Sequence, residues 1–212
     1  MNIQKIITII IIIVVFISCS AELSIKDHTP KRVAILGDSL VSSGNIASML
    51  NLWTTDKIEF MELGDGGATP ESLYFKLNDF IQHKYDEYII MVGINSIDQP
   101  ASTMKYLSAC ARYIKSRSIN TPKIYMCTLL PWRGYETWTV SNQNNSDQIN
   151  EWIKTKPDGI DGVLIFDWMK GVHMGMQSDE FRGDGLHPNE QGYIAMAGYI
   201  FRLLYDGVYN KK

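Results

Sequence analysis

The chain has 212 residues, of which 45% are hydrophobic, 20% charged and 11% aromatic, and its formal net charge is -3. This composition is that of a globular protein, and the length suits one domain with a substantial core. The absence of a basic excess argues against nucleic acid as a partner. The three cysteines are too few for a disulfide framework.

The N-terminal residues predict export rather than folding. Lys5 precedes an apolar run over 6–17, which is typical of a secretory signal and too short for a comfortable transmembrane helix. Cys19 follows, and this context resembles a bacterial lipobox, in which cleavage leaves a lipid-bearing cysteine, although Phe16 stands where Leu is usual. Cleavage without lipid and an uncleaved anchor are the alternatives. We expect a signal peptide over 1–18, a tether over 19–30 and a globular domain over 31–212, exported to the bacterial cell envelope and anchored to its membrane through Cys19.

Strand-like and helix-like segments alternate along the rest of the chain. Five short apolar runs predict strands buried on both faces, at 32–36, 58–61, 88–92, 124–127 and 163–166. Apolar residues at helical spacing predict helices over 70–83, 100–116 and 189–204. The stretch 130–145, rich in Trp, Asn and Ser, reads as a long loop. The pattern predicts an α/β fold, a three-layer α/β/α sandwich with a mostly parallel, flavodoxin-like central sheet of about five strands.

Polar and glycine-rich segments follow the predicted strands, where sites form in open α/β sheets. They are Gly37-Asp38-Ser39-Leu40, the turn 64–69 and Gly93-Ile94-Asn95-Ser96, and Asp184-Gly185-Leu186-His187-Pro188 precedes the last helix. Each has a simpler explanation taken alone: a serine or histidine cap, turn glycines, a left-handed asparagine, or an Asp-x-x-His pair that ligates metal. Acyl transfer needs all of these parts together, so their joint occurrence favours a hydrolase.

Their order and spacing resemble the SGNH hydrolases, also called the GDSL esterase/lipase family. The segments at Ser39 and at Asp184–His187 match its first and last blocks, and Gly67 and Asn95 fall in its second and third. The resemblance runs from about residue 32 to the end. Two positions depart from it: Glu62 stands where the second block often has Asn, and Ser96 replaces an Asp of the third.

The resemblance implies a catalytic triad and an oxyanion hole. Ser39 would be the nucleophile, His187 the general base and Asp184 the group that orients the imidazole. The Ser39 and Gly67 amides and the Asn95 side chain would stabilise the oxyanion. Because glycine has no Cβ, we expect the Gly67 amide to approach the oxyanion closely. The chain would be a serine esterase that forms an acyl-enzyme on Ser39 and needs no cofactor or metal.

A second hypothesis, from a different class, is a non-catalytic envelope lipoprotein that uses the same fold to bind a glycan or a partner. The substrate cannot be identified from the sequence; a small-molecule, glycan or lipid ester fits, with a slight preference for acetyl or acyl groups on envelope glycans or lipids. Trp132, Tyr135 and Trp138 are candidate substrate contacts by stacking on a sugar or lining an acyl pocket, or they pack the loop against the body.

Overall fold

The structure is a computed structural model that describes residues 29–54, 57–171 and 177–205. The expected signal peptide, nearly all of the expected tether and Cys19 lie outside these residues. Within them, no helix is both long enough and apolar enough to cross a membrane.

The centre of the molecule is a five-stranded parallel sheet in the order β2-β1-β3-β4-β5. Its strands are β1 (Lys31–Gly37), β2 (Ile58–Gly64), β3 (Glu87–Met91), β4 (Lys123–Cys127) and β5 (Gly162–Leu164). This is the flavodoxin-like order, so the predicted fold class is confirmed. Because all strands are parallel, their carboxyl ends lie at one end of the molecule and their beginnings at the other.

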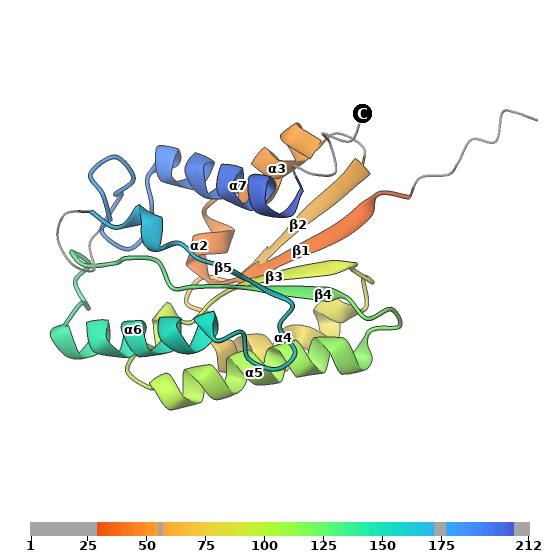
Figure 1. Cartoon of the computed structure of the whole chain (residues 1–212), viewed down its shortest axis with the longest axis horizontal. Helices are drawn as coiled ribbons and strands as arrows, with labels where there is room; N and C mark the ends of the chain where they lie inside the picture. The colour runs from red at the N-terminus through yellow and green to blue at the C-terminus, as the bar shows by residue number, and fades with distance from the viewer. Residues whose placement is uncertain (1–28, 55–56, 172–176, 206–212) are drawn as a thin grey trace, which may run out of the picture.

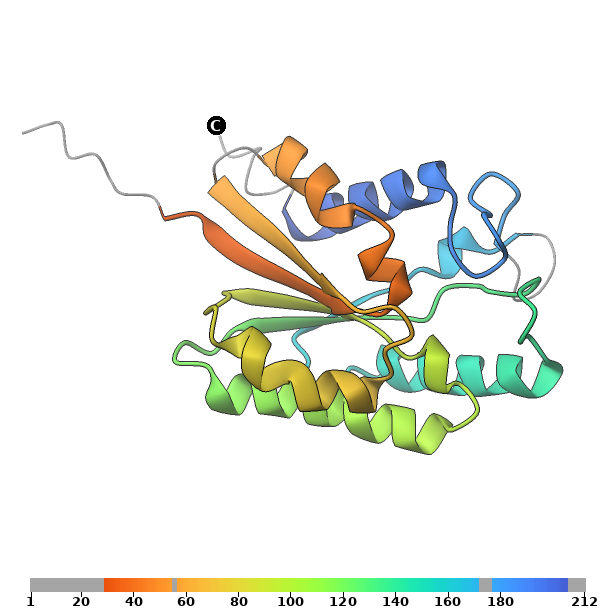
Figure 2. The ribbon, with the colours of Figure 1, turned by 180° about the vertical axis from the view of Figure 1, so that it is seen from behind.

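Helices cover both faces of this sheet (Figures 1 and 2). One layer holds α4 (Pro70–Ile81), α5 (Pro100–Arg117) and α6 (Val140–Lys154), and the other holds α2 (Ser39–Ser42), α3 (Ile46–Thr54) and α7 (Glu190–Leu204). Two short 3₁₀ turns, η2 (Ile94–Ser96) and η3 (Asp167–Met169), follow β3 and β5.

The alternation of side chains along a strand divides the core into two halves. Ala34 and Leu36 of β1 belong to the cluster under α4, α5 and α6, whereas Val33 and Ile35 belong to the cluster under α3 and α7. Every residue of β3 is buried, as a central strand covered on both faces requires. The two helical layers therefore bury both faces of the sheet.

The expectation of a loop over 130–145 was wrong beyond residue 139. Helix α6 begins there, with Thr139 as its N-cap, and polar residues such as Asn150 face inward. Asn150 accepts from the Leu129 amide at 2.7 Å and donates to its carbonyl at 3.1 Å, so the side chain is satisfied although buried. Tertiary contacts such as these override the weak helix propensity of an Asn- and Ser-rich sequence. Helix α3 was also not predicted, while the three predicted helices lie within two residues of their expected bounds.

Candidate active site

Three side chains from two distant segments form one hydrogen-bonded row. His187 Nε2 lies 2.8 Å from Ser39 Oγ, and His187 Nδ1 lies 2.8 Å from a carboxylate oxygen of Asp184. Ser39 and His187 are 148 residues apart, so only the tertiary fold brings them together. The row has the geometry of a nucleophile, its base and the acid that orients the base.

Ser39 is presented by a sharp turn from β1 into α2. Asp38 caps this helix, with one carboxylate oxygen accepting from the Leu40 amide at 3.0 Å. Ser39 is therefore the first residue of the helix, where an amide has no intrahelical acceptor and is directed outward. The expectation that the Ser39 amide lies at a helix N-terminus is confirmed.

The acid and the base share a tight turn before α7. One oxygen of Asp184 accepts from the amides of Leu186 at 2.9 Å and His187 at 2.7 Å, while the other faces the imidazole. Burial alone would raise the pKa of Asp184, but the hydrogen bonds from the side chain and backbone of His187 and from Leu186 outweigh it and hold that pKa below its usual value. Asp184 thus stays ionised and can orient the imidazole.

Gly185 in this turn is a residue whose importance the sequence motif alone did not reveal. Its φ is +102°, and a Cβ there would lie 2.7 Å from the Gly134 carbonyl carbon and 2.8 Å from the Tyr135 nitrogen. The segment after β4 therefore packs directly on the turn that carries Asp184 and His187. The Tyr135 ring also meets the His187 ring edge to face, with centroids 6.5 Å apart.

Gly67 and Asn95 lie in the same pocket as Ser39 and His187. Asn95 Nδ2 donates to the Ala68 carbonyl at 3.0 Å, which fixes the amide plane and leaves its second N–H for a ligand. Gly67 has φ +76°, and a Cβ added there would meet nothing within 4 Å. The left-handed backbone favours glycine at this position. The close approach of the Gly67 amide to an oxyanion stays a prediction.

The pocket has a volume of about 490 Å³ and two kinds of wall. Ile94, Ile97, Trp132 and Leu186 are buried apolar residues on its floor, and polar groups including Asp98, Glu136 and Asn142 surround them. The cavity therefore offers both apolar and polar contacts to a ligand.

The three aromatic residues after β4 have different surroundings. Trp132 is only 1% exposed and is part of the core, with one edge on the pocket. Tyr135 lines the pocket. Trp138 is not among the pocket-lining residues: its Nε1 donates to Gln143 at 3.0 Å and Arg133 lies over its ring. Tyr135 and the edge of Trp132 are placed for contact with a ligand, whereas Trp138 packs the loop.

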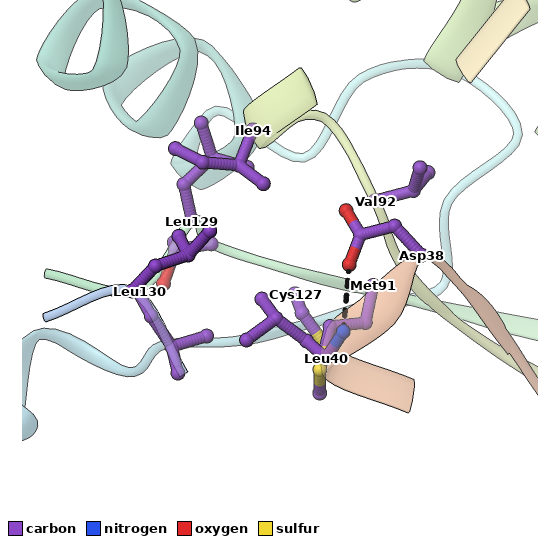
Figure 3. Close-up of a pocket in the computed structure, with 10 residues that line it drawn as sticks. Asp38, Leu40, Met91, Val92, Ile94, Cys127, Leu129 and Leu130 are labelled. Atoms are coloured by element: carbon purple, nitrogen blue, oxygen red, sulfur yellow. Dashed lines mark hydrogen bonds between the residues drawn. The ribbon is translucent and has the colours of Figure 1, made fainter. Parts of the chain in front are cut away.

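Beneath the nucleophile, the Asp38 carboxyl is fully buried (Figure 3). One oxygen accepts from Leu40, and the carboxyl borders a small cavity of about 10 Å³ whose other walls are mostly apolar. Burial raises the pKa of Asp38 to about 6, although the Leu40 and Gly93 amides and the charge of His187 oppose the shift. A second titrating group therefore lies directly under the triad.

Both departures from the family pattern have structural roles. Glu62 accepts from the Ala47 amide at 3.0 Å, in the first turn of α3, and so caps that helix from β2. Ser96 Oγ lies 2.7 Å from Thr103 Oγ1, which also donates to the Ser96 carbonyl at 2.9 Å. These contacts join η2 to α5 and do not involve the triad.

Comparison with solved structures relates this geometry to known proteins. A protein of the G-D-S-L lipolytic family from Desulfitobacterium hafniense is 21% identical, with TM-score 0.68 over 82% of this chain and 99% of its own. A GDSL-like lipase from Bacteroides thetaiotaomicron is 18% identical, with TM-score 0.69 over 84% and 89%. An acetylxylan esterase from Geobacillus stearothermophilus is 16% identical, with TM-score 0.64 over 82% and 95%.

The chain therefore shares its fold with these two GDSL-family proteins and this acetylxylan esterase. No protein-family model and no curated protein matches the sequence. At 16–21% identity this likeness concerns the fold alone, because proteins that share a fold can differ in function.

Proposed function

We propose that this protein is a serine esterase that hydrolyses carboxylic esters through an acyl-enzyme on Ser39. The observation that carries the proposal is the continuous row Ser39–His187–Asp184, with two contacts of 2.8 Å, at a pocket that also holds Gly67 and Asn95. A non-catalytic binding protein would not need a serine aligned with a base and an oriented acid.

In the first half of the reaction, Ser39 Oγ attacks the carbonyl carbon while His187 Nε2 takes the hydroxyl proton. The oxyanion forms near the Ser39 and Gly67 amides and the free N–H of Asn95. His187 then returns the proton to the alcohol as its C–O bond breaks. In the second half, water gives a proton to His187 and attacks the acyl-enzyme, and Ser39 recovers its proton as the acid leaves.

For the substrate, we propose a short acyl group, such as acetyl, on a polyhydroxylated alcohol. The buried residues that line the pocket are apolar, whereas its exposed residues include carboxylates and an amide that suit hydroxyl donors. The carboxylates of Asp98 and Glu136 disfavour an anionic substrate. One structural neighbour is an acetylxylan esterase, which agrees with an acetylated glycan.

We further propose that Cys19 carries the lipid that holds the enzyme in the bacterial envelope.

Labelling with a fluorophosphonate, which reacts with an activated serine, tests the proposal together with a series of nitrophenyl esters of increasing acyl length. Ser39→Ala and His187→Ala should each abolish labelling and nearly all hydrolysis while the circular dichroism spectrum stays the same. The double variant should be barely worse than either single variant, because triad members act as a unit. Hydrolysis by folded Ser39→Ala protein would contradict the mechanism.

A further inference from the structure

The sheet separates the catalytic pocket from the point where the chain enters the fold. Lys31 begins β1 and Ser39 follows its end, so a strand of seven residues, roughly 20 Å long, lies between them. The N-terminal segment with Cys19 therefore joins the molecule at the end opposite the site. We call this end, where all five strands begin, the tether end, and the other the site end (Figure 1, right and left).

Several elements meet at the tether end around Lys31. Lys31 forms an ion pair with Glu87 at the start of β3, and its ammonium lies 5.3 Å from the centre of the Tyr205 ring, just after α7. Thr54, the last residue of α3, donates a hydrogen bond of 3.2 Å to the carbonyl of Ile58 at the start of β2. The C-terminal ends of α3 and α7 thus lie beside the place where the tether leaves (Figure 2).

Large apolar side chains are exposed at this end. Leu52 is 81% exposed, Trp53 39%, Ile119 82% and Leu203 54%, and they come from α3, the α5–β4 connection and α7. Trp53 is held edge to face by Phe201, with ring centroids 6.2 Å apart. Exposed apolar residues also occur elsewhere, at Phe75 and Val140 for example. The tether end differs in the charged residues that it also carries.

Cations lie at the same end as these apolar residues. Three acids of the tether end are paired with cations of the same end: Glu87 with Lys31, Glu59 with Arg32 and Asp161 with Lys115. Among the described residues, Asp79, Asp86 and Asp158 are further acids here. The additional cations of the described part of this end outnumber these three: Lys57, Lys84, Arg117, Lys123, Lys156 and Arg202. Two of these cations, Lys84 and Arg117, line a cavity of about 410 Å³ together with exposed Ile119.

The site end has the opposite charge. Its connections carry an excess of acids, which include Asp98, Glu136, Asp179, Glu180, Asp184 and Glu190. Among the described residues of the same connections, the cations are Arg133, Lys170 and Arg182, and the last two pair with Asp167 and Asp179. The molecule is therefore polarised along the strands, with a positive tether end and a negative site end.

We infer that the tether end is a docking surface for an anionic lipid bilayer. Exposed Trp and Leu suit the interface between head groups and acyl chains, and each cation near an anionic leaflet strengthens docking about fivefold. The negative site end is repelled by the same leaflet. Docking consequently turns the pocket away from the membrane, so the ester that it hydrolyses lies in the space beyond the bilayer. The inference rests on the proposed envelope location but not on the catalytic mechanism.

Two tryptophans of equal exposure provide a matched test. Trp53 lies at the tether end and Trp168, in η3, at the site end, and each is 39% exposed. The full chain is reconstituted in vesicles whose acyl chains carry bromine, a short-range quencher of tryptophan fluorescence, with or without phosphatidylglycerol. Quenching in the anionic vesicles should be largely lost in Trp53→Phe and kept in Trp168→Phe. Quenching that depends on Trp168, or on neither residue, would overturn the inference.

A charge reversal and an oligomer assay complete the experiment. Lys123→Glu combined with Arg202→Glu should reduce quenching by anionic vesicles to the level of neutral ones, whereas Lys105→Glu, from an exposed part of α5 near the site end, should not. If Trp53 is instead covered by a second copy of the chain, sedimentation in detergent will show a dimer that Trp53→Phe weakens, which would also overturn the inference. None of these measurements depends on esterase activity, so failure of the proposed function would leave them interpretable.

Discussion

In the proposed mechanism, Ser39 gains its reactivity from neighbours that the backbone holds in place. His187 contacts the hydroxyl, Asp184 holds the imidazole, and Asp38 caps the turn that presents the serine. Activity should fall at acid pH, because an imidazolium cannot accept the serine proton. The individual residues around this row can be tested separately.

Asn95 should act on the transition state. Removing one oxyanion donor lowers turnover by roughly 10²–10³, so Asn95→Ala should reduce kcat by that factor with KM little changed. Ser96→Ala is the neighbouring control, because that hydroxyl bonds to Thr103 rather than facing the reacting atoms. Steady-state kinetics on one ester measure both variants; an effect confined to KM would assign Asn95 to ground-state binding.

Asp38 should make stability depend on pH. Burial raises its pKa from 3.8 to about 6, so between these values the folded protein holds a proton that the unfolded chain releases. The Asp38 contribution to the free energy of unfolding therefore falls as pH rises through this range, by up to about 3 kcal/mol. Asn does not titrate, so Asp38→Asn should gain stability relative to the parent chain between pH 4 and pH 7.

Urea unfolding across that range measures the difference between the parent chain and Asp38→Asn. Asp98→Asn is the control, because that side chain is exposed in the pocket mouth. A parallel pH dependence of the parent chain and Asp38→Asn would mean that the buried carboxyl keeps its charge throughout.

At the scale of elements, the site depends on two segments that press against each other. The turn before α7 carries Asp184 and His187, and the segment after β4 lies against it at Gly185. In Gly185→Ala, the new Cβ would lie 2.7 Å from backbone atoms, at a residue whose φ is +102°. The variant should therefore lose several kcal/mol of stability, or its turn should shift and kcat should fall more than a hundredfold.

Gly198 provides the matched control for Gly185. It lies inside α7, and a Cβ there would have no neighbour within 4 Å. Gly198→Ala should raise stability by up to about 1 kcal/mol, since alanine favours a helix over glycine, without affecting kcat. Thermal unfolding and nitrophenyl acetate hydrolysis test both variants; full activity and stability in Gly185→Ala would show that the two segments are not tightly coupled.

At the scale of the whole molecule, the proposed anchor and the proposed docking surface act at the same end. Cys19→Ala should stall processing or release the protein from the membrane fraction, because diacylation normally supplies most of the membrane affinity. Fractionation and immunoblotting follow both outcomes, with Cys110→Ala as a control, since that cysteine is free and buried in the core. Normal cleavage with unchanged membrane partitioning would contradict lipidation at Cys19.

The sequence alone predicted the fold class and the three side chains that the structure brings into one hydrogen-bonded row. Buried parallel strands need continuous apolar runs, and acyl transfer needs a particular set of residues, so both leave local patterns in the sequence. The Ser39 and Asp184–His187 segments are such patterns, and the structure brings them within hydrogen-bonding distance.

Only the tertiary structure decided the features that depend on contacts between distant segments. Helix α6 forms because its polar residues find partners such as the Leu129 backbone, which no local pattern contains. Glu62 caps α3 across 15 residues, Gly185 is constrained by residue 134, and the pKa of Asp38 is set by burial. The charge separation between the two ends likewise appears only after folding, because parallel strands collect residues from distant parts of the chain at each end.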